Sequence, residues 1–353
     1  MLAPKPGNAK QSDVNSEPPA ALADQLGRPL TDLRVSVTDR CNFRCGYCMP
    51  REHFDHDHRY LPRAEILSFE EIVRVVSGLV PLGLRKVRLT GGEPLLRHEL
   101  PKLVAMLARV PGLDIALTTN GSLLAKQARA LRSAGLGRLT VSLDSVSPEV
   151  FARMTDSELP VTDVLAGIAA AREAGFGPLK INAVVRRGIN DHTLVELARH
   201  FKGSGDIVRF IEFMDVGLTN GWRLDHVVSG REIVARIGAE LPIEPASSNY
   251  RGEVAKRYRY LDGSGEIGVI TSVTQPFCGD CTRLRLSADG QLFGCLFARV
   301  GRDLRPLLRA SEDDAELGSA MREFWQARSD RYSELRSAST ASLPRLEMSY
   351  LGG

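Results

Sequence analysis

The stretch DRCNFRCGYCMP, Asp39–Pro50, directly follows a short β-rich run at Leu33–Val37. It holds three cysteines, Cys41, Cys45 and Cys48, in the spacing C-x3-C-x2-C. A structural zinc ion is bound by four protein ligands with no open position, and iron–sulfur clusters normally take four cysteines. Three thiolates therefore leave one metal position free, which is useful where an open metal binds a reactant.

The loop after the cysteines, HFDHDH at His53–His58, leaves two other interpretations open. One of its histidines (His53, His56 or His58) could complete a Cys3His zinc site with the triplet. The loop could also bind a metal by itself, as His-rich tracts do. We favour an exposed loop and an open metal on the cysteines, because the triplet follows a strand of a β/α pattern, where functional residues gather.

The β/α pattern extends outward from this stretch, as short β-rich runs alternate with amphipathic helical stretches. The predicted strands are Leu33–Val37, Lys86–Leu89, Asp114–Leu117, Arg138–Leu143, Leu179–Val185 and Ile207–Ile211. The predicted helices between them include Phe69–Val80, Glu99–Ala108, Leu123–Ser133, Thr162–Ala174 and Thr193–Phe201. Such alternation predicts a parallel α/β sheet with right-handed crossovers. Six units fall short of a closed eight-stranded barrel, so we expect a partial (β/α)6 barrel of TIM type, with a flat doubly wound sheet as the alternative.

Changes in pattern divide the chain into three parts. Residues 1–24 are rich in Pro, Ala, Ser and Asn without periodicity and are predicted to be a disordered tail. Residues 25–240 form the predicted barrel, and 241–353 a smaller α+β domain that begins with a linker-like stretch, LPIEPASSNYRG. In that domain we predict strands at Val254–Tyr260, Gly265–Ile270, Leu284–Ser287 and Leu292–Gly294, and helices near Leu304–Leu308 and Asp314–Arg328.

Composition excludes several classes of protein. Of 353 residues, 43% are hydrophobic and 25% charged, as in globular proteins in water. No apolar run reaches the roughly 18 residues of a membrane span, and no signal-peptide or transit-peptide pattern is present. We therefore expect a cytoplasmic protein without a membrane partner. A net charge of +3 is too small to predict binding to nucleic acid.

A second cysteine triplet lies in FCGDCTRLRLSADGQLFGC, Phe277–Cys295. Its members are Cys278, Cys281 and Cys295, and every cysteine of the chain belongs to one triplet or the other. A zinc ribbon lacking one ligand is possible, although the nearest histidine in the sequence is the distant His226. Cytosolic disulfides are improbable. Two groups of three therefore suit two separate metal centres better than three disulfide bridges.

Basic residues accompany the strands and the second triplet: Arg34, Arg88, Lys180, Arg209, Arg283 and Arg285. A single arginine is usually a solvated surface charge, but an unpaired charge in a buried β run is costly. Arg283 and Arg285 alternate at the strand period and share one face. Because guanidinium groups suit phosphate oxygens, this pattern predicts a polyphosphate substrate.

The first triplet with its aromatic residue, CNFRCGYC at Cys41–Cys48, resembles the C-x3-C-x-Φ-C signature of the radical S-adenosylmethionine (SAM) superfamily, with Tyr47 as Φ. The resemblance implies a [4Fe–4S] cluster whose open iron chelates SAM. It also makes TGGEP (Thr90–Pro94), SLD (Ser142–Asp144) and Met214 contacts of SAM. By themselves these three would be a strand-to-helix turn, a helix cap and a core residue.

More specifically, the chain from Leu26 to Gly353 resembles the GTP 3′,8-cyclase family of molybdenum cofactor biosynthesis. The resemblance rests on both cysteine triplets, on LFA after the second, on RFIEFMDVG and on the Gly-Gly end. It implies a lyase that converts GTP to (8S)-3′,8-cyclo-7,8-dihydroguanosine 5′-triphosphate. In this reaction a 5′-deoxyadenosyl radical abstracts the 3′ hydrogen, C3′ then bonds to C8, and the product radical is reduced and protonated.

The resemblance also implies roles for individual residues. The three cysteines of each triplet would hold a [4Fe–4S] cluster, and guanine would bind the open iron of the second. The SAM contacts would be Tyr47, Gly92, Ser142 and Met214. The GTP contacts would be Arg34, Arg88, Thr118, Lys180, Arg209, Arg283 and Arg285. Gly352 and Gly353, which composition alone predicts to be a frayed end, would enter the active-site channel and be needed for turnover.

Partners follow from the resemblance as well: GTP as substrate, an electron donor (flavodoxin-type or other), a downstream cyclic pyranopterin monophosphate synthase and a second copy in a homodimer. Two other functions stay open. One is a different two-cluster radical SAM enzyme, for example one that modifies peptides, although such enzymes usually carry more C-terminal cysteines. The other is a zinc-binding interaction or nucleic-acid module.

Overall fold

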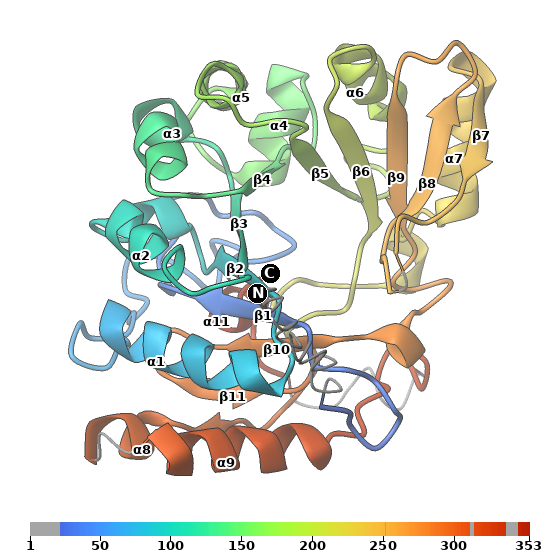
Figure 1. Cartoon of the computed structure of the whole chain (residues 1–353). Helices are drawn as coiled ribbons and strands as arrows, with labels where there is room; N and C mark the ends of the chain where they lie inside the picture. Colours follow the sequence, from blue (N-terminus) through green and yellow to red (C-terminus); the bar gives the residue numbers. More distant parts are fainter. Residues whose placement is uncertain (1–21, 251, 311–313, 337–344) are drawn as a thin grey trace, which may run out of the picture.

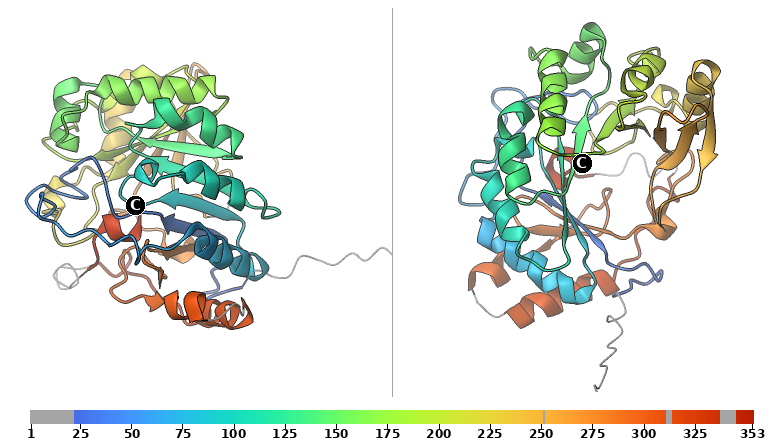
Figure 2. Two further views of the ribbon diagram at one scale, coloured as in Figure 1. Left: turned by 90° about the vertical axis from the view of Figure 1, so that its left-hand side faces the viewer. Right: turned by 45° about the horizontal axis from the view of Figure 1, so that its top comes forward.

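A computed structural model describes residues 22–250, 252–310, 314–336 and 345–353 of the chain. Within these residues, all named strands belong to one sheet in the order β12-β11-β10-β1-β2-β3-β4-β5-β6-β9-β8-β7. The sheet curves around an interior, and helices cover its outer side (Figures 1 and 2).

The centre of the sheet is a partial barrel of six parallel strands in chain order. They are β1 (Asp32–Ser36), β2 (Lys86–Thr90), β3 (Asp114–Thr119), β4 (Arg138–Ser142), β5 (Lys180–Val185) and β6 (Ile207–Glu212). Each strand pairs in parallel with the next. A doubly wound sheet would reverse its strand order at a switch point. The sequential order therefore excludes that alternative and confirms the partial barrel.

Helices between the strands pack their apolar faces on the outside of the barrel. They are α1 (Phe69–Leu79), α2 (Leu100–Leu107), α3 (Leu124–Ser133), α4 (Pro148–Thr155), α5 (Val161–Glu173), α6 (Leu194–Phe201) and, after β6, α7 (Gly230–Glu240). In α1, Ser68 and Glu71 form a capping box that fixes the first turn. Sequence analysis did not name α4, which follows the SLD stretch.

The C-terminal part supplies both flanks of the sheet. Its elements are β7 (Ile243–Ala246), β8 (Lys256–Tyr260), β9 (Glu266–Ile270), β10 (Arg283–Leu286), β11 (Gln291–Phe293), β12 (Arg302–Asp303), α8 (Arg305–Ala310), α9 (Asp314–Gln326) and α11 (Met348–Leu351). Strand β10 runs parallel to β1, and β9 runs parallel to β6. The sheet thus continues across residue 240, and the division into two domains there stays a prediction.

Two expectations were wrong in detail. The linker-like LPIEPASSNYRG contains β7, which pairs antiparallel with β8. Its Pro245 is tolerated because β7 is the edge strand of the sheet. The other error concerns the predicted disordered tail, of which residues 1–21 lie outside the described part of the chain. Its last three residues are ordered: the Leu22 amide donates to Leu82 O at 3.0 Å, and Asp24 is buried.

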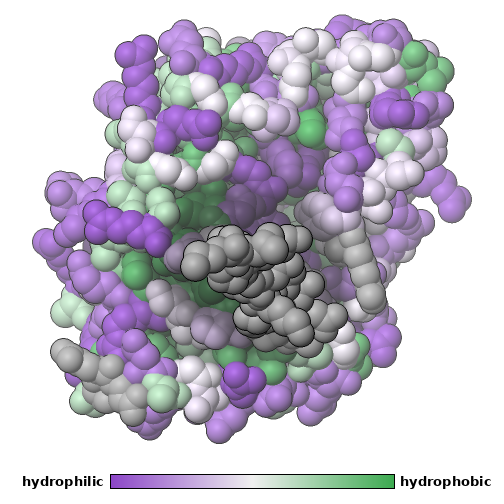
Figure 3. Space-filling view, viewed as in Figure 1, coloured by the Kyte–Doolittle hydropathy of each residue, from purple (hydrophilic) through white to green (hydrophobic). Residues whose placement is uncertain are grey.

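The outer surface is dominated by hydrophilic side chains, and apolar ones show mainly in the recess at the centre of the viewed face (Figure 3). Among the described residues, no helix has the length and apolar character that crossing a membrane requires.

Candidate active site

The two cysteine triplets lie at opposite ends of the sheet's parallel strands: the first at their carboxyl ends and the second at their amino ends. Cys41 follows the carboxyl end of β1, whereas Cys281 immediately precedes β10, which is parallel to β1 and begins level with it. Cys295 follows β11, whose antiparallel course returns the chain to the same edge as Cys281. The triplets are thus separated by a strand of five residues, about 17 Å at the usual rise.

The glycines of TGGEP press against the backbone of the cysteine loop. The Gly92 amide donates to Thr38 O at 2.8 Å, and the Glu93 amide donates to Arg40 O at 2.7 Å. A Cβ on Gly92 would overlap the Arg40 carbonyl, and one on Gly91 would meet Thr38 O. Gly91 also has φ +149°. Glycine is therefore required here for close backbone approach, which fixes this loop relative to β2.

Glu93 and Asp144 tie the cysteine loop to the next strands. Glu93 is buried and accepts hydrogen bonds from Thr119 Oγ1 (2.6 Å) and the Asn120 amide (2.7 Å) at the end of β3. Burial raises its pKa to about 7. Tyr47 OH donates to Asp144 Oδ2 at 2.8 Å, and burial raises the pKa of Asp144 to about 6. The resemblance made TGGEP and SLD contacts of SAM, but it did not predict these structural hydrogen bonds of their carboxyl groups.

Burial is the largest cause that raises the pKa values of the first triplet's thiols. It raises the pKa of Cys41 to about 11, with a contribution from Glu93, and that of Cys45 well above its usual range. Buried thiols deprotonate only with a compensating cation, so the donor set suits a metal centre. Cys48 shows the same direction.

Neither triplet is gathered as tightly as a single metal ion would hold it. In neither triplet do all three sulfurs lie within 4.8 Å of one another, among the residues that the structure describes. Tetrahedral zinc with Zn–S bonds of 2.3 Å would bring them to about 3.8 Å. An iron–sulfur cluster binds each cysteine on a different iron and spreads the sulfurs further. Each triplet therefore offers a donor set that could hold an iron–sulfur cluster with one open iron.

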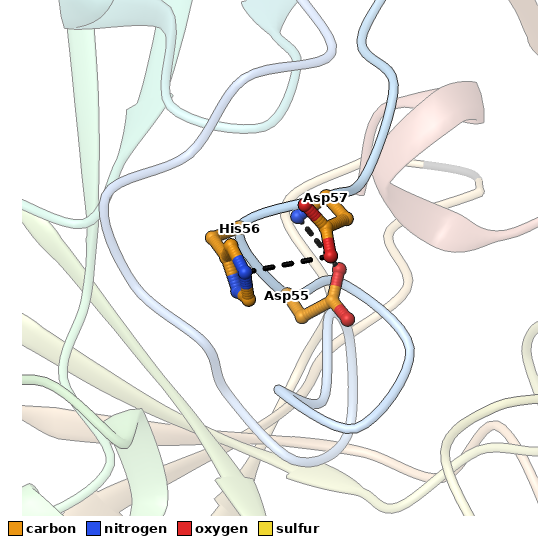
Figure 4. A group of neighbouring side chains, drawn as sticks. All are labelled: Asp55, His56 and Asp57. Carbon is orange, nitrogen blue, oxygen red and sulfur yellow. Dashed lines mark hydrogen bonds and ion pairs between the residues drawn. The ribbon is translucent and has the colours of Figure 1, made fainter.

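The HFDHDH loop offers no ligand to the triplet in this structure. Its Asp55, His56 and Asp57 form a small exposed group in which His56 Nε2 lies 3.4 Å from Asp57 Oδ2 (Figure 4). These two side chains are 89% and 82% exposed. This part of the loop is exposed, as favoured from the sequence.

The second triplet is held by arginines. Arg328 Nη2 donates to Cys281 Sγ at 3.3 Å, and Arg283 lies nearby. Although burial opposes ionisation, these two guanidinium groups lower the pKa of the Cys281 thiol to about 6. By contrast, burial and the charge of Asp330 raise the pKa of Cys295 to about 11.

Arginines line the inner face of the sheet between the two triplets. Strand register places Arg34 of β1 directly between Arg88 of β2 and Arg285 of β10. Arg34 has no hydrogen bond or ion pair to a described residue. Burial, and then the charges of Arg285, Arg283 and Arg88, lower its pKa well below the usual range. Burial likewise lowers the pKa values of Arg88 and Arg285 to about 10.

The positive charge continues around the barrel. Arg88 Nη1 donates to Thr118 Oγ1 at 3.0 Å, so the predicted GTP contacts Arg88 and Thr118 touch. Arg209 Nη2 lies 3.9 Å from Glu253 Oε1, and its buried Nε has no hydrogen-bond partner among the described residues. Burial and the charge of Arg209 are the leading causes that lower the pKa of Lys180 to about 7.

Two pockets open at the amino-terminal edge of the barrel strands. One, of about 250 Å³, is lined by Arg138, Lys180 and Arg209 among others. The other, of about 550 Å³, is lined by Lys86 and Arg138 among others. Lys86 and Arg138 were not among the predicted site residues, although each begins a strand and, at period two, lies on the same face as Arg88 or Thr140. In this state they pair with Asp32 and Asp114 respectively.

The predicted SAM contacts lie at the carboxyl ends of their strands. Ser142 ends β4 beside Asn182 of β5, whose buried Oδ1 has no hydrogen-bond partner among the described residues. Met214 is half-buried after β6, and its carbonyl accepts from Asn220 Nδ2 at 3.1 Å. Gly92 and Tyr47 border the same edge through the contacts given above. The unsatisfied side-chain oxygen of Asn182 could accept a hydrogen bond from a polar ligand bound here.

The C-terminal segment lies inside the curve of the sheet (Figure 1). Leu351 is fully buried, and Arg285 Nη1 donates to Gly352 O. Thr90 Oγ1 donates to Gly353 O at 3.3 Å. A Cβ on Gly352 would lie 2.7 Å from Thr90 Cγ2, and its φ is +73°. Only glycine therefore fits this position without strain, and composition alone was misleading about the end of the chain.

Glu347 anchors this segment to the loop after β6. Its Oε1 accepts from the Leu218 amide at 3.0 Å and its Oε2 from Thr219 Oγ1 at 2.9 Å. We expect Glu347→Ala to weaken docking of residues 348–353 by about 100-fold or more, because each of the two bonds to its charged group contributes about 1.5–3 kcal/mol. Hydrogen exchange of the C-terminal peptide measures the docking. Glu323→Ala, on the exposed face of α9, is the control, and unchanged exchange in Glu347→Ala would contradict the anchor.

Comparisons with known proteins agree with this geometry. Residues 35–201 match the family model of the Radical SAM superfamily, and 206–334 match that of Molybdenum Cofactor Synthesis C. The GTP 3′,8-cyclase of Acidothermus cellulolyticus is 55% identical, over 94% of this chain and 99% of the relative. Those of Xanthomonas axonopodis pv. citri and Staphylococcus carnosus are 50% and 46% identical, over 95% and 94% of this chain and 99% of each relative.

Solved structures show the same fold at low identity. Streptococcus suis SuiB bound to S-adenosylmethionine superposes with a TM-score of 0.60 at 14% identity, covering 89% of this chain and 72% of that one. Its complex with the precursor peptide SuiA gives 0.59 at 14% identity, with 84% and 67% coverage. The chain is 46–55% identical to these cyclases over nearly its full length, and it carries two cysteine triplets at the two ends of a cationic barrel. It therefore belongs to the GTP 3′,8-cyclase family of radical SAM enzymes.

Proposed function

We propose that this chain is a lyase that converts GTP to (8S)-3′,8-cyclo-7,8-dihydroguanosine 5′-triphosphate, the first step of molybdenum cofactor biosynthesis. The observation that carries the proposal is the group of mutually repelling cations enclosed between two cysteine triplets. Arg34, Arg88 and Arg285 lie side by side on adjacent strands, and none of them forms an ion pair with a carboxylate of the residues that the structure describes. A bound triphosphate supplies the missing negative charge.

Each triplet would hold a [4Fe–4S] cluster with one open iron. Cys41, Cys45 and Cys48 would bind the first, which together with SAM supplies the one-electron chemistry of the reaction. Tyr47, Gly92, Ser142 and Met214 border that edge and are proposed to contact SAM. Asn182, whose Oδ1 has no hydrogen-bond partner among the described residues, lies beside Ser142 on the neighbouring strand.

At the other edge, Cys278, Cys281 and Cys295 would bind the second cluster, whose open iron takes the guanine base. The proposed GTP contacts between the clusters are Arg34, Arg88, Thr118, Lys180, Arg209, Arg283 and Arg285. Arginine side chains fork to phosphate oxygens and orient the nucleotide along the barrel axis. Gly352 and Gly353, whose carbonyls accept from Arg285 and Thr90, would enclose the reacting end and exclude water there.

Other parts of the proposal concern partners. The reaction requires an external electron donor of flavodoxin type or another reductant. Its product would pass to a cyclic pyranopterin monophosphate synthase, and the chain would work in the cytoplasm as a homodimer.

The deciding experiment incubates anaerobically reconstituted protein with SAM, a strong reductant and GTP. We expect 5′-deoxyadenosine to form in step with consumption of GTP and appearance of an isomeric product. ATP in place of GTP is the control for nucleotide specificity. Deoxyadenosine without loss of GTP would reject the substrate, and stoichiometric zinc without iron would reject the whole proposal.

Lys180 should make the binding of GTP depend on pH. Burial and its cationic neighbours lower its pKa from 10.5 to about 7, so at pH 8 the free protein mostly carries the neutral amine. A triphosphate favours the charged form, and GTP binding is expected to take up about one proton at pH 8. Titration calorimetry in two buffers of different ionisation enthalpy measures the uptake. Lys180→Met should abolish it, and equal uptake in both proteins would exclude Lys180 as the acceptor.

The same shift affects the stability of the free protein. Between pH 7 and 10.5 the unfolded chain binds the lysine proton and the folded chain does not. The contribution of Lys180 to the free energy of unfolding therefore increases as the pH is raised through this window.

A further inference from the structure

Three buried charges lie directly behind the second cysteine triplet. Asp24 Oδ2 accepts from Arg28 Nε at 2.6 Å and from Arg328 Nη1 at 3.0 Å. The exposed fractions of the Asp24, Arg28 and Arg328 side chains are 0%, 1% and 2%. Burying two guanidinium groups and one carboxylate costs several kcal/mol per ion. A well-packed apolar cluster would be at least as stable, so the triad calls for another explanation than stability.

The donors of the two arginines reach the chain at all three cysteines. Arg328 Nη1 also donates to Cys281 O at 2.9 Å, and its Nη2 donates to Cys281 Sγ at 3.3 Å. Its Nε donates at 2.8 Å to the carbonyl of Gly294, the residue before Cys295. Arg28 Nη1 donates to Cys278 O at 2.9 Å. Each segment that supplies a thiolate is thus fixed by a charged hydrogen bond.

Further packing holds the Arg328 side chain in one position. Its guanidinium lies over the Trp325 ring, 4.7 Å from the centroid, and Trp325 Nε1 donates to Arg28 O at 3.2 Å. A Cβ on Gly294 would lie 3.3 Å from Arg328 Cγ and 2.5 Å from Asp330 Oδ2, so glycine permits this approach. A fork that is rigid and already oriented loses little entropy when it binds a sulfur ligand.

We propose that Asp24, Arg28 and Arg328 are positioning residues for the second cluster, and that the Arg328 guanidinium raises the reduction potential of this cluster through its N–H···S bond to Cys281. The inference rests on the proposed second cluster. A cationic donor to a ligating sulfur stabilises the reduced, more negative state of an iron–sulfur centre. Asp24 keeps Arg328 aimed at the sulfur, and Arg28 fixes the chain at Cys278.

The test isolates the second cluster in the full-length chain. In a parent protein in which Cys41, Cys45 and Cys48 are replaced by alanine, the reconstituted chain should hold about four irons. The midpoint potential and the electron paramagnetic resonance spectrum of the reduced state are then compared with those of Arg328→Gln, Arg328→Lys and Asp24→Asn. Arg302→Gln is the matched control, because it removes an arginine that pairs with Glu323 at the protein surface.

We expect the potential to shift to more negative values in Arg328→Gln, less in Arg328→Lys, and not in Arg302→Gln. Asp24→Asn should keep the iron at first but lose it faster to a chelator. A parent protein that takes up no iron would reject the second cluster and with it that part of the proposed function. If the parent protein holds a cluster and the Arg328 variants show the same midpoint potential and the same spectrum as the parent, the inference is overturned. If Arg328→Gln fails to fold, Arg328→Lys decides by the same two readouts.

Discussion

Replacement of Cys45 by alanine is expected to reduce formation of 5′-deoxyadenosine to the background rate, with or without GTP. Cys45 is the middle cysteine of the first triplet, and the nearby Asp55, His56 and Asp57, which form an exposed group of their own, are not placed to replace it. Two remaining thiolates cannot hold a site-differentiated [4Fe–4S] cluster, so iron should fall from about eight to about four per chain.

Binding of GTP should survive the Cys45→Ala substitution, because the arginines lie on strands whose register does not depend on the cysteine loop. Iron analysis, quantification of deoxyadenosine and equilibrium binding of GTP are the three measurements. Cys295→Ala is the informative companion, since it should also halve the iron but leave SAM cleavage without GTP in place. Wild-type deoxyadenosine formation by Cys45→Ala would remove the first triplet from the reaction.

Replacement of Arg34 by methionine is expected to act in opposite directions on stability and on substrate binding. In the free protein Arg34 lies between Arg88 and Arg285 in register and is repelled by both. An apolar side chain of similar length removes this repulsion and should raise the free energy of unfolding by about 1–3 kcal/mol. The melting temperature should increase by several degrees, at roughly 2–4 °C per kcal/mol.

The Arg34→Met variant should bind GTP about 10- to 150-fold more weakly, because bonds from a charged donor to phosphate contribute about 1.5–3 kcal/mol. Thermal unfolding without nucleotide and titration calorimetry with GTP measure the two effects. Arg109→Met, at an exposed position after α2, should change neither quantity. A lower melting temperature together with unchanged GTP affinity would show that Arg34 is structural and would remove it from the phosphate site.

The barrel strands were predictable because their sequences carry a local signal. Each of the six is a short β-rich run between helical periods, and the predicted bounds differ from the observed ones by at most two residues. β7 was missed because Pro245 and the serines after it imitate a linker, and only an edge strand tolerates that composition. Parts of the fold with a local pattern could be predicted, and those that depend on position in the sheet could not.

The candidate site shows the same division. Cysteine spacing and period-two arginines identify residues that share a loop or a strand face. Arg328 gives no such signal, because it meets Asp24 across 304 residues of sequence. The bond between Tyr47 and Asp144 was not predicted, because it forms only when the ends of β1 and β4 come together. Contacts between distant segments follow from tertiary packing and not from any pattern in a short window.

The pairing of β1 with β10 has a consequence during synthesis of the chain. Asp32 and its partner Thr282 are 250 residues apart. At 5–20 residues per second the ribosome needs roughly 10–50 s to cover that distance. During this interval one edge of β1 has no partner, and the same holds for β6 while residues 213–265 are synthesised. Unpaired parallel edges recruit other chains. The nascent polypeptide is therefore most vulnerable to aggregation before its last third emerges, and slower growth or additional chaperone should increase the yield of folded protein.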